Sequence, residues 1–279
     1  MKEWKTVIGE ESGFFDFRVK ELWEYRDLCM MFIRKNYITR YKQTVLGPLY
    51  MLLRPLITSG VFSVVFGAIA GVSTDGVPDF LFFMAGNLIW TLFSGCISEN
   101  SNTFLGNAYI MGKVYFPRLV IPLANTITRM ISVSVQFFIF IIFVLIYWKS
   151  GSGIRPNGWV WMTPILMIMI AVMGLGIGLV VSSFTVRYRD AGVMLGFVMN
   201  LAMYITPVIY PVSSLEGIWR TVAMINPVAP IIEMVRYAFF GAGIFSVIGI
   251  LWSCIFAIIV GICGIVLFNK VEKNFIDTI

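Results

Sequence analysis

The sequence of 279 residues contains no histidine and only four cysteines. Without histidine, the chain has no imidazole for acid/base catalysis, for a Ser-His-Asp triad or for a metal site. It also lacks the sequence G-x-x-x-x-G-K-[ST], the phosphate-binding loop with which many proteins hold ATP. Any energy from ATP must therefore come from another subunit.

The four cysteines are not placed to form disulfides. Cys29 precedes the first apolar run, and Cys96, Cys254 and Cys263 lie inside apolar runs. No pair falls in an outer loop, where an oxidising environment would preserve a disulfide. We expect four free thiols.

Charged residues are also scarce, at 13% of the chain, whereas soluble globular domains carry about 25%. Hydrophobic residues make up 58% and the mean hydropathy is +0.86. Apolar runs of about 20 residues, long enough to cross a bilayer, recur along the chain. The sequence therefore predicts an all-α, polytopic membrane protein with six transmembrane helices, at residues 49–71, 80–101, 119–148, 159–184, 193–210 and 244–268.

The polar N-terminal stretch is not a cleavable signal peptide, because the first apolar run begins only at about Leu49. We expect the mature chain to begin at Met1. Residues 1–48 should form a cytoplasmic N-terminal region with an interfacial helix, and residues 49–279 a six-helix transmembrane domain.

The distribution of basic residues predicts the orientation, since Lys and Arg in short loops stay in the cytoplasm. Nine of them precede the first span, whereas residues 72–79, the loop after it, contain none. Later inner loops carry Lys113, Arg118, Arg187 and Arg189, although the outer loops also hold Lys149, Arg155, Arg220 and Arg236. Both termini are therefore expected in the cytoplasm. The net charge of +6 reflects membrane topology rather than nucleic-acid binding.

Residues 21–42 have the pattern of an amphipathic helix. Leu22, Cys29, Phe32 and Ile33 share one face, and charged residues occupy the other. The pattern predicts a helix on the inner membrane surface. An ordinary helix packed on cytoplasmic protein is the alternative, because amphipathicity does not identify the apolar partner.

Residues 102–118 mix polar residues with Phe104 and Tyr109 before Pro117. They predict either a short helix that presents aromatic rings to a cytoplasmic partner or an interfacial loop with its rings in the headgroup layer.

Residues 211–243 contain Pro211, Pro227 and Pro230, and also charged residues that leave apolar pieces of about ten residues, too short to cross. We expect short outer re-entrant helices between spans five and six, and a cavity near the outer face. A plain extracellular loop is the alternative.

Four strings carry a family resemblance: RYKQTVLGPLY at 40–50, KVYFPR at 113–118, RYRD at 187–190 and TPVIYP at 206–211. In this order they resemble the membrane subunits of type-2 ABC exporters for cell-surface polysaccharides, the O-antigen and teichoic-acid permeases. The resemblance runs from about Glu21 to the C-terminus.

This resemblance implies a homodimer in the plasma (inner) membrane with two cytoplasmic ATP-binding subunits. The cargo would be an undecaprenyl-diphosphate-linked polysaccharide moved to the outer face. No cofactor is implied on this chain, because ATP and Mg would bind the partner subunit. By position, residues 213–243 would close the exit and Leu46 and Gly47 would shape the inner mouth. The expected ATPase contact consists of Asn107, Tyr109, Lys113 and Tyr115.

Arg54 lies about one and a half turns into the first span, some 8 Å by helix rise. Near a helix end it can extend to the interface. Alternatively Arg54, with Arg40 and Lys42, attracts the diphosphate of the lipid carrier, because guanidinium groups bind phosphate oxygens bidentately.

A passage for polysaccharide is expected to present aromatic faces to sugar rings without holding any unit tightly. The candidates are Tyr50, Phe62, Phe66, Tyr204 and Tyr210. Packing against other helices or facing lipid is the alternative role for these rings.

Small and polar residues within the spans predict helix contacts. Gly174, Gly176 and Gly178 allow close approach of a neighbouring helix, which we expect within the subunit, with the dimer interface as the alternative. Asn87 and Asn200 need polar partners or water.

Two other functions are compatible with a polytopic chain. A secondary transporter or channel would use ionisable residues within the spans, and Arg54 and Arg129 are the main candidates. A membrane-embedded lipid or sugar transferase would need clustered acidic residues, and Asp75 with Asp79 comes nearest but resembles a polar turn. We assign no catalytic residue and no metal ligand.

Overall fold

The computed structural model describes residues 19–41, 47–188 and 190–275, and every regular element in these ranges is helical. The elements are α1 (Val19–Glu24), α2 (Arg26–Tyr41), α3 (Gly47–Phe62), η1 (Ser63–Ile69), α4 (Asp79–Ser101), α5 (Thr103–Met111), α6 (Val120–Lys149), η2 (Gly158–Met162), α7 (Thr163–Thr185), α8 (Ala191–Ile205), η3 (Val212–Ser214), α9 (Gly217–Ile225), α10 (Ala229–Phe240) and α11 (Val247–Phe275). The all-α prediction is confirmed.

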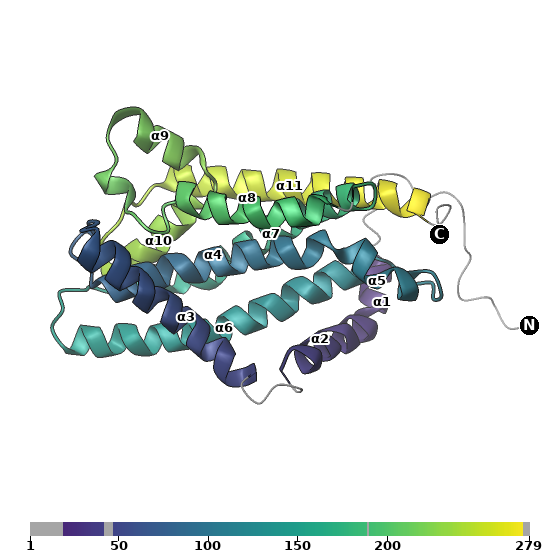
Figure 1. Cartoon of the computed structure of the whole chain (residues 1–279), viewed down its shortest axis with the longest axis horizontal. Coiled ribbons are helices and arrows are strands. Elements are labelled where there is room, and N and C mark those ends of the chain that lie inside the picture. The colour runs from purple at the N-terminus through teal and green to yellow at the C-terminus, as the bar shows by residue number, and fades with distance from the viewer. Residues whose placement is uncertain (1–18, 42–46, 189, 276–279) are drawn as a thin grey trace, which may run out of the picture.

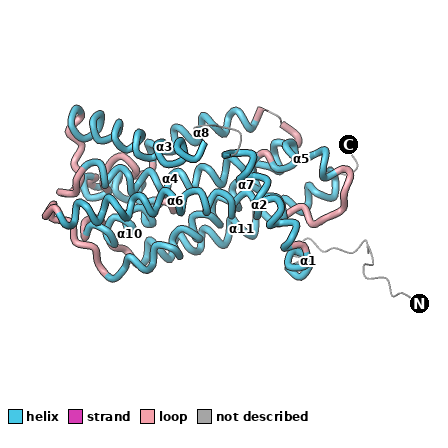
Figure 2. The backbone as a smooth tube through the Cα atoms, turned by 90° about the horizontal axis from the view of Figure 1, so that it is seen from below, coloured by secondary structure: helices cyan, strands magenta, loops and turns pink. Residues whose placement is uncertain are grey.

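The long helices lie side by side in an elongated bundle, which Figures 1 and 2 show from two directions. α1, α2 and α5 lie at one end of it, together with the C-terminal end of α11, and α9 and α10 lie at the other. We call these the α5 end and the α9 end. α4 is the central helix, since every residue from Leu81 to Trp90 is buried. Its principal neighbours are α7, α6 and α3.

Five helical stretches are long and apolar enough to cross a membrane: Leu49–Ile69, Asp79–Ser101, Val120–Lys149, Gly158–Thr185 and Val247–Val271. They correspond to five of the six predicted spans. α8 corresponds to the other but has only 15 residues, a rise of about 22 Å against a hydrocarbon core of about 30 Å.

The helical prediction was wrong at the end of the fifth span, which does not continue to Tyr210. α8 ends at Ile205, and Thr206 is extended with ψ 140°. The reason is Pro207, because proline disfavours the helical conformation of the residue before it.

α9 and α10 form a helix pair bent by 97°, which confirms the predicted short helices before the last span. An apolar groove of about 440 Å³ lies between α9 and the start of α11, where Trp252 donates its indole N–H to the Ile225 carbonyl at 2.9 Å. Because this groove is apolar, the predicted cavity near the outer face stays a prediction.

A buried ion pair anchors α10, the second helix of this pair, to the segments that precede and follow the pair. Arg236 and Glu233 are 1% and 0% exposed, with 2.9 Å between Nη1 and Oε1. The Arg236 guanidinium also donates to the carbonyls of Pro207 and Val208, at 2.8 Å each, and lies 3.6 Å from the centre of the Phe82 ring. Glu233 accepts a hydrogen bond from the Ile244 N–H at 3.0 Å. Arg236 therefore stabilises the fold, and it should not be counted among the outer-loop basic residues that indicate membrane orientation.

The glycines of α7 allow close contact with two neighbouring helices. A Cβ on Gly178 would lie 2.7 Å from the Cβ of Asn100 in α4, and one on Gly176 would lie 2.6 Å from the Val260 carbonyl oxygen in α11. Gly174 also faces α4, 2.9 Å from the Phe93 carbonyl oxygen by the same construction. The prediction that these glycines pack within the subunit is confirmed.

Residues 21–42 are helical as far as they are described, with a break at Tyr25 between α1 and α2. α2 packs on α6, where Asn36 donates to the Asn125 side chain at 2.8 Å, and Phe32 is buried beside Phe116. Part of the apolar face therefore contacts the chain itself, and a position on the membrane surface stays a prediction. All four cysteines are free thiols, and burial raises the pKa of Cys29.

Candidate functional site

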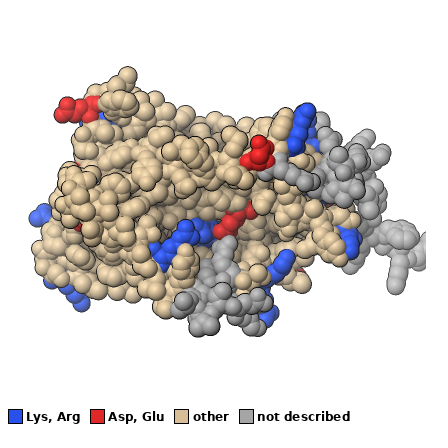
Figure 3. All heavy atoms as spheres, viewed as in Figure 1, with Lys and Arg blue, Asp and Glu red and all other residues tan. Residues whose placement is uncertain are grey.

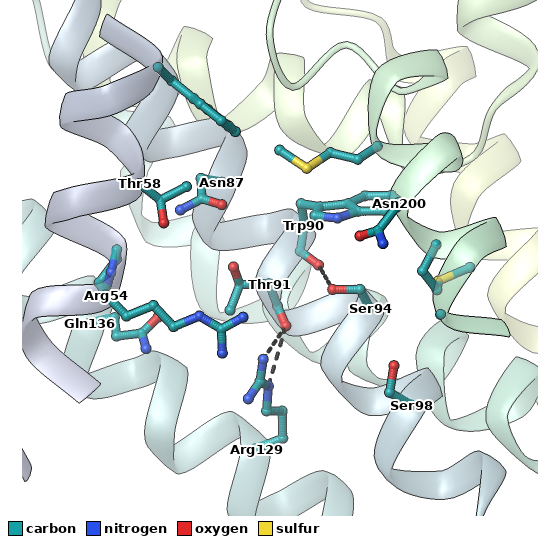
Figure 4. Close-up of a pocket in the computed structure, with 15 residues that line it drawn as sticks. Arg54, Thr58, Asn87, Trp90, Thr91, Ser94, Ser98, Arg129, Gln136 and Asn200 are labelled. Atoms are coloured by element: carbon teal, nitrogen blue, oxygen red, sulfur yellow. Dashed lines mark hydrogen bonds between the residues drawn. The ribbon is translucent and has the colours of Figure 1, made fainter. Parts of the chain in front are cut away.

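A polar cavity of about 340 Å³ lies inside the membrane domain, lined by α3, α4, α6 and α8. Figure 4 shows its polar side chains converging from these four helices. They are Arg54, Thr58, Asn87, Thr91, Ser94, Ser98, Arg129, Gln136 and Asn200. Asn87 and Asn200, two polar residues singled out within the spans, thus share one cavity.

Arg129 of α6 is anchored on α4. Its Nη2 and Nε donate to the Thr91 carbonyl oxygen at 2.8 and 3.3 Å, and its Nη1 lies 3.4 Å from Glu99 Oε1. The two charged side chains are only 15% and 21% exposed. Because charge at membrane depth is costly, an ion pair that borders a polar cavity in a helix bundle is a candidate functional site.

Gly95 makes room for this arrangement. It lies on α4 between Thr91 and Glu99, and a Cβ at this position would overlap the guanidinium of Arg129. The absence of a side chain here is therefore what allows Arg129 to reach the carbonyl of Thr91.

Arg54 extends from α3 into the cavity, toward Thr91 and Arg129 (Figure 4). Arg54 lies directly before Pro55. Proline has no N–H, so the helix lacks the hydrogen bond from residue 55 to the carbonyl four residues earlier. That carbonyl belongs to Met51, and Gln136 Nε2 donates to it at 3.2 Å. Gln136 thus compensates for the proline and ties α3 to α6.

The cavity therefore brings two guanidinium groups together, and the carboxylate of Glu99 lies 3.4 Å from one of them, that of Arg129. The face of the molecule in Figure 3 is hollowed, and basic and acidic atoms lie next to each other in the hollow. Arg54 is seven residues from the start of α3 and Arg129 nine from the start of α6, whereas Glu99 is two residues before the end of α4. Because α4 ends and α6 begins near α5, Glu99 and Arg129 lie in the half of the bundle toward the α5 end.

The other wall of the cavity is apolar. It includes Phe62, Trp90, Met199 and Met203. Polar groups on one side and aromatic and methionine side chains on the other suit an amphipathic ligand with an anionic head.

Arg54 and the five aromatic residues were predicted to line a channel, and of these six the structure brings Arg54 and Phe62 into the cavity. Phe66 packs 5.5 Å from Phe62 and 6.3 Å from Phe83, between ring centres. The Tyr210 hydroxyl donates to the Ile205 carbonyl at 2.7 Å. Tyr50 and Tyr204 are 61% and 60% exposed on the outside of the subunit. Their part in a channel stays a prediction.

The predicted ATPase contact lies on and after α5, at one end of the bundle. Tyr109 and Tyr115 are 74% and 57% exposed, and Lys113 Nζ donates to the Tyr109 hydroxyl at 2.7 Å. Asn107 instead turns back, and its side chain donates to the Thr103 carbonyl at 3.0 Å. Of the two alternatives for residues 102–118, the structure shows the short helix, and the contact with an ATPase stays a prediction.

The predicted inner mouth lies largely outside the described residues. Lys42 and Leu46 are not described, and the side chain of Arg40 is not described either. Gly47 is the first residue of α3. The role of these four residues at the inner mouth therefore stays a prediction.

Asp75 and Asp79 take part in turns, as predicted. Asp75 accepts hydrogen bonds from the Ser213 hydroxyl at 2.7 and 2.8 Å, and Asp79 accepts one from the Thr74 hydroxyl at 3.0 Å. In the part of the chain that is described, no group of three acidic, cysteine or histidine residues could hold a metal ion.

Sequence reasoning did not identify Glu99 and gave Arg129 no partner. The signal was present, because both are charged residues inside or at the end of predicted spans. Their pairing depends on the register of α4 against α6, which the apolar pattern does not specify.

A bundle of helices long enough to cross a membrane around a polar cavity is compatible with a membrane transport protein. The family model described as "ABC-2 type transporter" matches residues 27–240, and the chain therefore belongs to the ABC-2 transporter membrane family.

Similar proteins carry a common name. The chain is 28% and 26% identical to two proteins of Klebsiella pneumoniae, each named O-antigen export system permease protein RfbA, over 90% of this chain and 94% of each relative. It is 24% identical to a protein of the same name from Myxococcus xanthus, over 80% of this chain and 84% of that relative. The predicted family resemblance is confirmed.

Proposed function

We propose that this chain is the membrane subunit of an ATP-driven exporter. Its cargo would be a polysaccharide linked to undecaprenyl diphosphate, moved from the cytoplasm to the outer face of the plasma membrane. The observation that carries the proposal is the match, over 90% of the chain, to relatives named O-antigen export permeases. The polar cavity between the spans supports it.

A second copy of the chain would complete the passage. The cavity of about 340 Å³ is small for a sugar polymer, and it is flanked by α3 and α8, which expose large apolar side chains. Among them are Ile57 and Val61 on α3 and Phe197 and Leu201 on α8. A homodimer that met along these helices would enlarge the cavity into a channel and cover these side chains.

Two ATP-binding subunits would drive transport, with ATP and Mg bound to them. The exposed rings of Tyr109 and Tyr115, with Lys113 between them in sequence, offer a contact at the α5 end. The start of α1 and the end of α11 lie at this same end (Figure 1), as expected if both termini are cytoplasmic.

The proposal can be tested by complementation of a bacterium whose own O-antigen permease gene is deleted. Expression of this chain with its cognate ATP-binding subunit should restore surface polysaccharide, detected by a lectin or antibody on intact cells. The double variant Tyr109→Ala/Tyr115→Ala should lower the restored amount at least severalfold, because it removes the aromatic contact. Trp161→Ala, an 87% exposed aromatic residue in η2, is the matched control and should have little effect.

Two outcomes would overturn the proposal. One is a correctly inserted chain that restores no surface polysaccharide with its ATP-binding subunit. The other is full restoration without any ATP-binding subunit, which would favour a secondary transporter. A membrane-embedded transferase would instead change the composition of the glycan rather than its location.

A further inference from the structure

We propose that the polar cavity binds a phosphate group carried by a lipid, that Arg54 and Arg129 are its ligands, and that Glu99 competes with the phosphate for Arg129. The site would receive the phosphate of the exported lipid, and in this it rests on the proposed function.

Arg129 is positioned before any ligand arrives. Its Nη2 and Nε bind the Thr91 carbonyl, which fixes the plane of the guanidinium, and Gly95 leaves the space that this position requires. The position of the group is therefore set by the helix backbone of α4, and Nη1 contacts the carboxylate of Glu99. A prepositioned guanidinium loses little freedom when it binds phosphate oxygens.

The contact between Arg129 and Glu99 is long for an ion pair. It measures 3.4 Å, whereas charge-assisted N–H···O hydrogen bonds are commonly about 2.7–2.9 Å. Glu99 keeps some access to solvent, with 21% of its side chain exposed. A phosphate oxygen could therefore displace the carboxylate from Nη1 without leaving a fully buried charge behind.

Arg54 supplies the second ligand. Within the described part of the chain it has no hydrogen-bond or ion-pair partner, and its side chain points toward Arg129 (Figure 4). Two facing guanidinium groups repel each other, and a phosphate between them would remove that repulsion. Two guanidinium groups line the described cavity and one carboxylate pairs with Arg129, so an excess positive charge remains for an anion.

The surroundings of the arginines favour a lipid over a soluble phosphate. Trp90, Met199 and Met203 line the apolar wall, and they would contact the hydrocarbon next to the phosphate. Arg129 and Glu99 lie toward the α5 end, the end expected at the inner leaflet. A lipid phosphate at that leaflet would thus enter the cavity without crossing the bilayer centre.

The proposal predicts opposite effects for two substitutions on one ion pair. Glu99→Gln keeps the shape of the side chain and removes the competing carboxylate, so phosphate binding should become tighter. Arg129→Gln removes a ligand, so binding should weaken by about tenfold, equivalent to about 1.4 kcal/mol at 25 °C. Gly95→Ala should weaken binding in the same way, because its methyl group displaces Arg129.

The experiment measures lipid binding to the full chain in phosphatidylcholine nanodiscs, with undecaprenyl diphosphate and phosphatidylglycerol as separate probes. Arg129→Lys guards against loss of folding and should bind more tightly than Arg129→Gln. Gly60→Ala is the matched control for Gly95→Ala, since a Cβ on Gly60 meets nothing within 4 Å. It should bind as the parent chain does.

Tighter binding by Glu99→Gln together with weaker binding by Arg129→Gln supports the proposal, whichever lipid responds. A response to undecaprenyl diphosphate alone assigns the site to the cargo carrier, and an equal response to both lipids assigns it to lipid phosphate in general. Unchanged binding of both lipids by both variants would overturn the proposal, even if complementation succeeds. If complementation fails but the two variants still change lipid binding as predicted, the proposed export function is overturned and the proposed phosphate site is retained.

Discussion

Replacing Arg236 with methionine is expected to lower the free energy of unfolding by about 3–5 kcal/mol, the usual cost of removing one partner from a buried ion pair. The carboxylate of Glu233 would remain buried with 0% exposure. The substitution would also leave the carbonyls of Pro207 and Val208 without their donor. SDS titration of the purified chain in mixed micelles measures this change.

Arg220→Met is the matched control, because Arg220 lies exposed on α9 at the same end of the bundle. It should change the free energy of unfolding by less than about 0.5 kcal/mol, as surface substitutions usually do. The double variant Glu233→Gln/Arg236→Met should recover part of the loss, since it removes the uncompensated charge. A loss as small for Arg236→Met as for Arg220→Met would show that this ion pair does not anchor α10.

Replacing Gly176 with leucine is expected to destabilise the chain by about 1–3 kcal/mol or more, because overpacking forces helices apart. The backbone of α7 lies directly against α11 here, and even a Cβ would lie 2.6 Å from the Val260 carbonyl oxygen. The displaced atoms belong to a backbone rather than to a flexible side chain, so no rotamer change can relieve the clash. The same SDS titration measures the loss.

Gly192→Leu is the control for this variant, since Gly192 lies on α8 and a Cβ there meets nothing within 4 Å. It should leave the unfolding curve nearly unchanged. Equal curves for Gly176→Leu and Gly192→Leu would contradict the close packing of α7 on α11.

The apolar pattern predicted most of the fold, because the length that a helix needs to cross a bilayer can be counted in the sequence. It also predicted the broken helices before the last span, since Pro227 and Pro230 interrupt the run. It failed at the end of α8. The apolar residues continue to Tyr210 and predicted a helix that long, but Pro207 disfavours the helical conformation at Thr206 and the helix ends at Ile205.

The candidate site was only partly predictable. Arg54 stood out as a lone charge in a span, and the structure places it in the cavity. The pairing of Arg129 with Glu99 depends on helix packing, and the burial of Arg236 depends on a chain fold that brings residues 206–211 beside α10. Aromatic residues were the weakest signal, because rings pack, face lipid or line cavities with the same sequence pattern.

The most direct test of the account is reconstitution of the purified chain in proteoliposomes, with and without its ATP-binding subunit. The measurement follows the movement of a labelled undecaprenyl-diphosphate-linked oligosaccharide between the leaflets. The account predicts movement only when both subunits, ATP and Mg are present, and no ATP hydrolysis by the chain alone. Robust hydrolysis by the isolated chain, or movement of the lipid without the ATP-binding subunit, would contradict it.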